Sequence, residues 1–316
     1  MSRLRAGWPA LLLNVLVLGL FAWAVEHYWG WSRLLSPWRH LEAGALLLAV
    51  AGLLLSYGIR AQRIYLAERD IPRGSYLACL RLILLNNAVN LLLPARSGEA
   101  SFPILMNRWF GIDAARATGT LIWLRLLDLH VLATIGAACA AAGWLDAQHR
   151  LSWVARAAAC LAAISPLLFF ALRQPLKARL EGHGGRIPLL LSRVLAGLPQ
   201  RYAGLALDLG LSWLSWGIKL SALGWVLSRL AQIPQALGTL GAIGGDLSTV
   251  LPVHTPGGFG TYAAGVMALL APGATPTGEL LVSAENLHLL VLTTALLAGA
   301  AAWLAGAAKP PADAKL

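Results

Sequence analysis

The feature that most constrains the fold of this chain is a series of long apolar runs separated by short polar segments. A helix needs about 20 apolar residues to cross the hydrocarbon core of a bilayer, and six runs reach or approach that length. They occupy residues 8–26, 41–58, 117–143, 151–172, 202–227 and 280–306. Only 12% of the 316 residues are charged and the mean hydropathy is +0.67, whereas about a quarter of a soluble domain is charged. An all-α integral membrane protein is therefore predicted.

Most lysines and arginines lie between these runs and indicate their orientation. They gather at Arg3 and Arg5, at Arg60, Arg63, Arg69 and Arg73, across residues 173–201, and at Lys309 and Lys315. Cytoplasmic loops carry an excess of such residues, so these places and both termini are assigned to the cytoplasm. Arg229 is an exception, because the same count puts it at the outer end of its helix.

The basic segment 173–201 divides a single polytopic domain, residues 1–316, into two halves. Its apolar face over residues 187–198 predicts a helix that lies on the cytoplasmic membrane surface. The net charge of 25 − 14 = +11 is then explained by anionic lipid headgroups. Nucleic-acid binding is not expected.

The N-terminal run has two interpretations. Residues 22–24 are Ala-Trp-Ala, which is similar to a signal-peptidase site, so residues 1–24 are either cleaved or form the first membrane helix. The near-spanning length of the run favours the helix.

Two further apolar regions are broken by proline and glycine. The first, 76–110, breaks at 94–99 and is interrupted again at Pro103; the second, 236–271, breaks at 251–260. Non-helical backbone at membrane depth is tolerated only where protein or a water-filled cavity satisfies it, so each break is expected to mark a site. The charge pattern makes the first region enter and leave from the cytoplasm and the second from outside. Six spanning helices and two re-entrant helical hairpins in an inverted repeat are predicted, with eight crossings as the alternative.

Charged residues within these regions are candidates for a substrate-binding site. Each costs about 2.5–3.5 kcal/mol at the bilayer centre, so each is expected to face a partner or a wet cavity. Arg125 and Asp128 share a helix face and either pin the bundle or take part in transport. Lys219 is expected either to contact a substrate phosphate or to form a buried pair with Asp246 or Asp128. The remaining intramembrane pair is Glu285 and His288.

The two breaks supply the other candidates. In the first, Arg96, Ser97, Gly98 and Glu99 combine an arginine with a serine that could cap the next half-helix, which would attract an anion. In the second, Thr255, Pro256, Gly257, Gly258 and Gly260 follow His254. Glycine permits positive φ and proline ends the helix, so free N–H groups before Thr261 would also favour an anion. His254 is either a satisfied loop histidine or a proton relay.

Catalysis has no evident place in the sequence. Cys79, Cys139 and Cys160 lie in apolar stretches, at spacings suited neither to zinc nor to a disulfide framework. No nucleotide-binding glycine loop, HExxH or GxSxG motif occurs. No cofactor, metal or enzymatic activity is expected, although Asp246 and His254 keep an intramembrane lipid-modifying enzyme open as a weaker hypothesis.

The two breaks, with Leu124-Arg-Leu-Leu-Asp128 between them, resemble the transmembrane, flippase-like domain of lysylphosphatidylglycerol synthases over nearly the whole chain. No aminoacyl-transferase domain follows residue 306, so a free-standing member without the synthase domain is expected. Relatives often carry a glutamate where this chain has Ala263. The resemblance therefore argues against a cationic lipid, unless Glu285 replaces that carboxylate.

The resemblance implies a lipid transporter of the bacterial inner membrane that moves a lipid with an anionic or polar headgroup between leaflets. Phospholipids, hopanoids and polyprenyl-linked lipids are the substrate classes implied. The alternative is a non-transporting partner that delivers lipid to a separate lipid or glycolipid synthase. A homo-oligomer and a complex with such a synthase are both compatible with the sequence.

Overall fold

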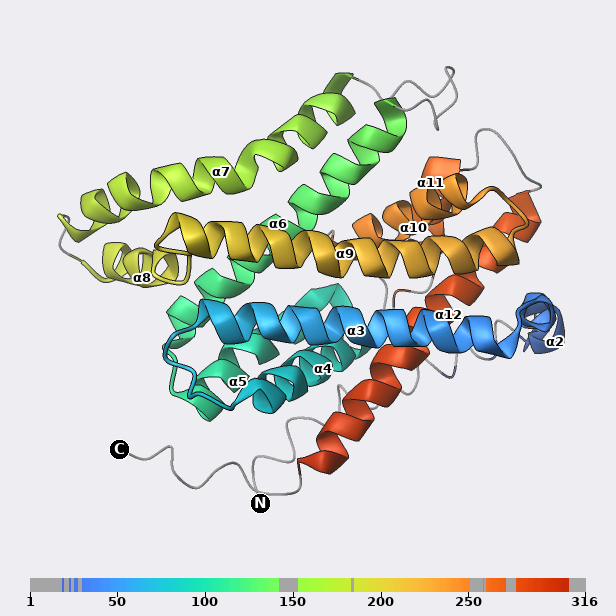
Figure 1. Cartoon of the computed structure of the whole chain (residues 1–316), viewed down its shortest axis with the longest axis horizontal. Coiled ribbons are helices and arrows are strands. Elements are labelled where there is room, and N and C mark those ends of the chain that lie inside the picture. Colours follow the sequence, from blue (N-terminus) through green and yellow to red (C-terminus); the bar gives the residue numbers. More distant parts are fainter. Residues whose placement is uncertain are drawn as a thin grey trace. The chain divides into compact units, whose positions relative to one another are not determined.

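In the part of the chain that the computed structural model describes, all regular secondary structure is helical and there are no strands. That part comprises residues 19, 23, 26–27, 30–141, 153–182, 185–250, 258, 260–270 and 277–306, apart from the side chains of residues 33, 40, 94–96, 140–141, 153–156, 158–159, 250 and 277. The helices, labelled as in Figure 1, are α2 (Trp31–Leu34), η1 (Ser36–His40), α3 (Ala43–Ala67), α4 (Tyr76–Leu92), η2 (Pro94–Ala100), α5 (Ser101–Phe110), α6 (Ala114–Ala141), α7 (Trp153–Glu181), α8 (Arg186–Leu195), α9 (Tyr202–Leu230), α10 (Gln235–Val250), α11 (Thr261–Leu270) and α12 (Thr277–Ala305).

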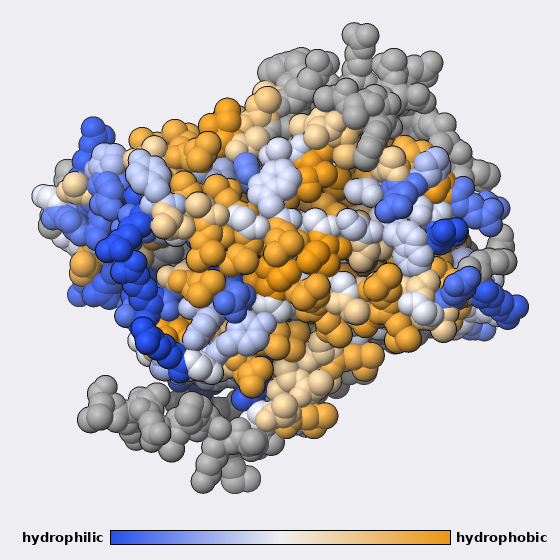
Figure 2. Space-filling model, in the orientation of Figure 1, coloured by the Kyte–Doolittle hydropathy of each residue, from blue (hydrophilic) through white to orange (hydrophobic). Residues whose placement is uncertain are grey.

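Several helices have the length and composition of membrane spans. Among the described residues, three are both long and apolar enough to cross a bilayer: Ala43–Ala67, Ala114–Cys139 and Gly278–Ala305. Helices α7 and α9 have 29 residues each, while most of the predicted first span, residues 8–26, lies outside the described part. Apolar side chains cover much of the face shown in Figure 2. The chain is thus a multi-pass membrane protein.

Both predicted breaks interrupt the helices. The first apolar region is divided into α4, with 17 residues, the 3-10 helix η2 and α5, with 10 residues. Asn86 Nδ2 donates a hydrogen bond of 2.8 Å to Ser101 Oγ, so the start of α5 folds back beside α4. The predicted interruption at Pro103 is wrong, because this residue lies in the first turn of α5, where a missing N–H costs no helical bond.

The second region is divided into α10, with 16 residues, and α11, with 10. Most of the turn between them, residues 251–257 and 259, lies outside the described residues. The two helices pack closely because Gly244 faces Gly265: a Cβ on either glycine would overlap the backbone of the other. Small residues let helix backbones approach in this way.

The contacts divide the chain into two compact units. Unit 1 comprises residues 1–50, 89–98 and 223–293, and unit 2 comprises residues 51–88, 99–222 and 294–316. In unit 1, α12 is joined to the N-terminal elements because Trp38 Nε1 donates to Asn286 Oδ1 and Asn286 Nδ2 donates to Leu34 O.

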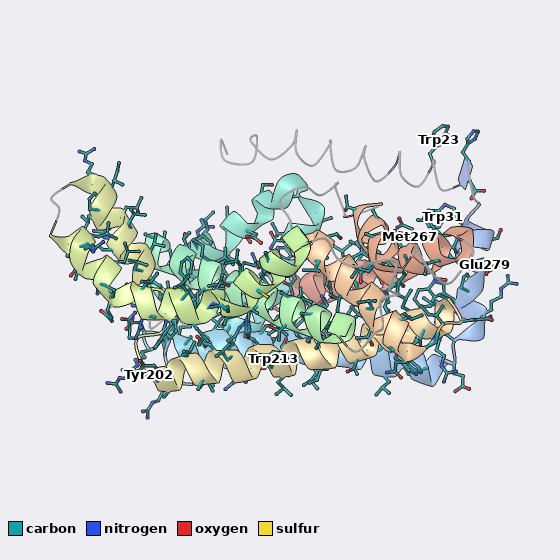
Figure 3. All side chains as sticks on the ribbon, turned by 90° about the horizontal axis from the view of Figure 1, so that it is seen from above. Trp23, Trp31, Tyr202, Trp213, Met267 and Glu279 are labelled. Carbon is teal, nitrogen blue, oxygen red and sulfur yellow. The ribbon has the colours of Figure 1, made fainter. Side chains whose placement is uncertain are left out.

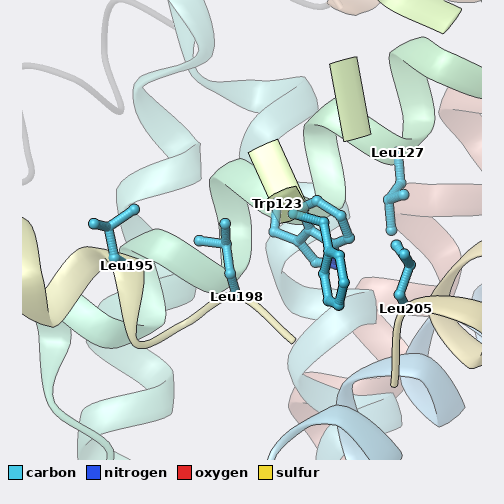
Figure 4. Close-up of a cluster of buried hydrophobic side chains, with 6 residues drawn as sticks. Trp123, Leu127, Leu195, Leu198 and Leu205 are labelled. Carbon is cyan, nitrogen blue, oxygen red and sulfur yellow. The ribbon is translucent and has the colours of Figure 1, made fainter. Parts of the chain in front are cut away.

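Unit 2 is built around α6, which packs against α5, α7 and α8. A cluster of buried side chains fills the space beside Trp123, as Figure 4 shows for the leucines around this indole. Its members are Trp123, Leu127, Phe170, Leu195, Leu198 and Leu205. This apolar packing holds α6 and the start of α9 together and so fixes the polar side chains that both helices carry.

Candidate functional site

Helix α9 carries a buried polar stripe. Four polar residues follow one another at intervals of four, three and four residues, which places them on one helix face. They are Asp208, Ser212, Ser215 and Lys219. Their relative exposures are 2%, 0%, 2% and 7%. Trp213, one residue after Ser212, is instead 39% exposed and projects from α9 in Figure 3. Buried polar groups need hydrogen-bond partners, and unit 2 provides them.

The carboxylate of Asp128 is the centre of these interactions. It lies 3.4 Å from the Arg63 guanidinium and accepts a hydrogen bond of 2.9 Å from Trp216 Nε1. Arg63 also donates to the hydroxyl of Ser212 on the α9 stripe. Asp128 and Arg63 are only 2% and 3% exposed. One carboxylate therefore connects α3, α6 and α9 in the interior of unit 2.

The ion chain continues toward the first broken region. Arg125 lies 3.4 Å from Asp128 on its own helix and 2.9 Å from Glu99 of η2. The predicted pairing of Arg125 with Asp128 is present. Glu99 was predicted as a site residue from its position in the break, and the structure joins it to the same chain of charges.

Two more cations lie around Trp216. The Lys219 Nζ atom is 4.7 Å from the centre of the indole ring and the Arg60 guanidinium carbon is 4.9 Å from it. Cations over an indole face are stabilised by its negative electrostatic potential. Since Trp216 also binds Asp128, the indole links both cations to the ion chain. We call these residues the Asp128 cluster; they are Arg60, Arg63, Glu99, Arg125, Asp128, Asp208, Ser212, Trp216 and Lys219.

The Asp128 cluster contains more basic than acidic groups. Its four cations are Arg60, Arg63, Arg125 and Lys219, and its three carboxylates are Glu99, Asp128 and Asp208. Asp208 accepts a 2.8 Å hydrogen bond from Trp123 Nε1 and has no ion-pair partner within 4.0 Å among the described residues. Electrostatic interactions are stronger in a weakly polar interior than in water. The cluster is therefore suited to an additional anionic group.

The assignment of Arg60 and Arg63 to a cytoplasmic loop was wrong. Helix α3 continues past residue 58 to Ala67 and buries Arg63 against Asp128. The spacing in the sequence contained this information, because Ser56, Arg60 and Arg63 lie four and three residues apart on one helix face.

A second polar group, which we call the Arg116 junction, was also missed. Arg116 forms ion pairs with Asp70 and, at 2.7 Å, with Glu68. Thr120 Oγ1 donates to the same Glu68 carboxylate at 2.5 Å. Gly119 and Gly197 let α6 approach the end of α8, since a Cβ on either would overlap backbone. The junction ties the end of α3 to the start of α6.

In unit 1, the second break is organised by Glu285. The backbone N–H of Gly260 donates a 3.1 Å hydrogen bond to Glu285 Oε1, and Glu285 is 7% exposed. Gly258 and Gly260 both have φ of +75°, which meets the expected need for glycine. The chain's own carboxylate therefore accepts the hydrogen bond from the first N–H before α11. The sequence predicted that an external anion would bind at this place.

Other polar groups surround this turn in unit 1. The ring of His288, one helical turn after Glu285, stacks on Tyr262 with 4.9 Å between ring centres. Within the described residues, Tyr262 Oη and Glu285 Oε2 are buried without a hydrogen-bond partner. Ala263, the position where relatives often carry glutamate, is fully buried beside Tyr262, and Asp246 on α10 is 1% exposed.

The remaining predicted residues are placed as follows. In η2, Ser97 is exposed and Gly98 is buried, where a Cβ would lie 2.6–2.7 Å from the backbone of Val89 and Asn90. The side chain of Arg96, together with His254, Thr255, Pro256 and Gly257, lies outside the described residues. Lys219 belongs to unit 2 and Asp246 to unit 1, and their pairing stays a prediction.

Residues 11–299 match the family model described as the lysylphosphatidylglycerol synthase TM region. No curated protein matches the chain. No solved structure matches it either.

Proposed function

The chain belongs to the family of lysylphosphatidylglycerol synthase TM regions, and from this premise we propose that it moves a lipid between the leaflets of the bacterial inner membrane. The lipid carries an anionic or polar headgroup. The protein binds and translocates it without covalent chemistry, and both termini face the cytoplasm.

The observation that carries this proposal is the excess of basic groups in the Asp128 cluster, which has four cations and three carboxylates. Burying charge in an apolar environment is costly unless the charge has a partner. A lipid phosphate would add a negative charge beside Lys219 and Arg60, whose positions around Trp216 are given by the two cation–indole contacts. Arginine and lysine are both well suited to phosphate oxygens.

The polar stripe of α9 offers a route for the headgroup. Asp208, Ser212, Ser215 and Lys219 cover three turns of the helix, which is about 16 Å of polar surface at 1.5 Å per residue. A headgroup passing along such a stripe stays hydrated or hydrogen-bonded while the acyl tails remain in the bilayer. The ion chain from Arg63 to Glu99 would open as the phosphate replaces a carboxylate beside Arg125.

The two broken regions are further candidates for contact with a headgroup. Helices α4, α5, α10 and α11 have 17, 10, 16 and 10 residues, each shorter than a typical span. We propose that each pair forms a re-entrant hairpin, one from each membrane face, as in transporters with inverted repeats. The free oxygen of Glu285 and the Tyr262 hydroxyl would then hydrogen-bond to the sugar or glycerol hydroxyls of a headgroup.

A flipping assay with reconstituted protein tests the proposal. Proteoliposomes containing fluorescent phosphatidylglycerol are treated with dithionite, which bleaches only lipid exposed to the outer leaflet. Lys219→Met removes the charge and keeps the side-chain length, and should slow flipping by roughly tenfold or more, the effect of one charge-assisted hydrogen bond. Lys177→Met is the matched control, because Lys177 lies at the surface of α7.

The outcomes separate the two hypotheses. Equal rates for wild type and Lys219→Met would contradict the site. Lipid that co-purifies with the protein without any flipping, together with co-purification of a lipid synthase, would favour the non-transporting partner.

A further inference from the structure

Arg229 is a basic residue that the proposed orientation leaves at the outer end of a spanning helix. Lysine and arginine are depleted there, so this residue calls for a specific reason. In the structure it lies in the last turn of α9, within unit 1, and is exposed. Its guanidinium carbon is 5.9 Å from the centre of the Trp225 ring, one helical turn earlier.

Arg229 and Trp225 form part of the wall of a pocket. The pocket has a volume of about 450 Å³ and lies where α9 ends and α10 begins. This volume is within the usual range for small-molecule sites. The lining residues are Trp225, Ser228, Arg229, Gln232, Ile233 and Gln235.

The chemistry of the lining favours an anion that accepts several hydrogen bonds. The pocket wall contains one guanidinium, two amides and one indole, and no acidic residue. Within the described part of the chain, no carboxylate lies within ion-pairing distance of Arg229. Amide N–H and guanidinium N–H groups are all donors, and a phosphate group presents acceptors on every side.

The local backbone brings the end of α9 and the start of α10 together at the pocket. Gln232 has φ of +52°, the left-handed conformation in which helices commonly end, and the Ile233 N–H donates a 3.0 Å hydrogen bond back to Ser228 O. Gly224 and Gly238 bring α9 and α10 into backbone contact, because a Cβ on Gly238 would overlap Gly224 O and Ser228 N. The two helices that carry the donors are thus in close backbone contact beside the pocket.

We propose that this pocket binds the phosphate of a lipid headgroup at the outer face of the inner membrane, where lipid enters or leaves the protein. The assignment rests on the proposed function for its role in transport. Binding itself does not depend on transport. The Trp225 ring beside Arg229 and the position at the end of an apolar helix suit a phosphate that is attached to a glycerol or sugar and to acyl chains.

Binding to full-length protein in a phosphate-free detergent tests the proposal. The probe is short-chain phosphatidylglycerol, measured by equilibrium binding, with inorganic phosphate as competitor. Arg229→Gln should weaken lipid binding on the order of fivefold, as expected for the loss of a partly exposed charge contact. Arg201→Gln, an exposed arginine at the start of α9, should leave binding unchanged. A photoreactive version of the same lipid should label the peptide that contains Gln232.

Each result supports or overturns the pocket. Unchanged lipid binding in Arg229→Gln, or labelling that avoids the peptide around Gln232, would overturn it. Inorganic phosphate that competes as strongly as the short-chain lipid would overturn the lipid assignment. If the wild type fails to flip lipid but still binds it through Arg229, the proposed function fails and the pocket stands.

Discussion

The Asp128 cluster of unit 2 and the turn before α11 in unit 1, which we call the Gly260 turn, are built from different kinds of polar group. In the cluster, side-chain charges from continuous helices meet over long sequence distances, as in the contact between Arg63 and Asp128. At the turn, the helix is interrupted and a backbone N–H meets one carboxylate, Glu285, beside two helices packed through glycine.

Because of this difference, the two regions should tolerate different amino-acid substitutions. Stability of the cluster depends on charge balance, so neutralising a charge should be costly there. Stability near the turn depends on close backbone packing, so an added methyl group should matter more.

The largest effect is expected from Asp128→Asn. The substitution leaves Arg63, which is 3% exposed, without its carboxylate, and removing one partner of a buried pair costs about 3–5 kcal/mol. The unfolding temperature in detergent should fall markedly. Asp113→Asn is the control, because this carboxylate is 47% exposed and 3.7 Å from Arg193, and exposed pairs contribute about 0–1 kcal/mol. Similar losses in both variants would contradict the contrast.

A smaller effect is expected from Gly244→Ala in unit 1. The new methyl group would overlap the backbone of Gly265, and overpacking of this kind costs about 1–3 kcal/mol. Thermal unfolding measures the loss. Gly210→Ala on α9 is the matched control, since no atom lies within 4 Å of its added Cβ, and it should be neutral or slightly stabilising. A stable Gly244→Ala protein would mean that α10 and α11 can separate without cost.

The smallest effect is expected from Glu285→Gln. The amide oxygen can still accept the Gly260 N–H, so only the charge contribution is lost, about 0.5–1.5 kcal/mol. Glu285→Ala removes the acceptor and should cost more. Hydrogen–deuterium exchange of the peptide containing Gly260 reports the difference locally: exchange should rise slightly in the first variant and strongly in the second. Equal exchange in the two variants would show that this carboxylate does not hold the turn.

Much of the fold followed from local patterns in the sequence. Helix breaks near Pro94 and after Val250 were predicted from proline and glycine, which act on their own backbone. The pairing of Arg125 with Asp128 was also local, because three residues separate them on one helix.

The rest of the candidate site depended on contacts between distant parts of the chain. Trp216 and Asp128 are 88 residues apart, and no local pattern predicts that an indole will bind a particular carboxylate. The error at Arg63 had a different origin. The positive-inside rule treats an arginine after an apolar run as a loop residue, whereas a buried partner on α6 allows the helix to continue through it.

The burial of Arg63 also has a consequence for how the protein is made. Its partner Asp128 lies 65 residues later in the chain, so α3 leaves the ribosome well before the carboxylate that neutralises it. At about 5–20 residues per second, the delay is roughly 3–13 s. Arg63 lies near the C-terminal end of α3, from which a long side chain can reach the headgroups. We therefore expect α3 to wait with its last turn at the membrane surface, and to settle fully into the membrane only when α6 is inserted beside it.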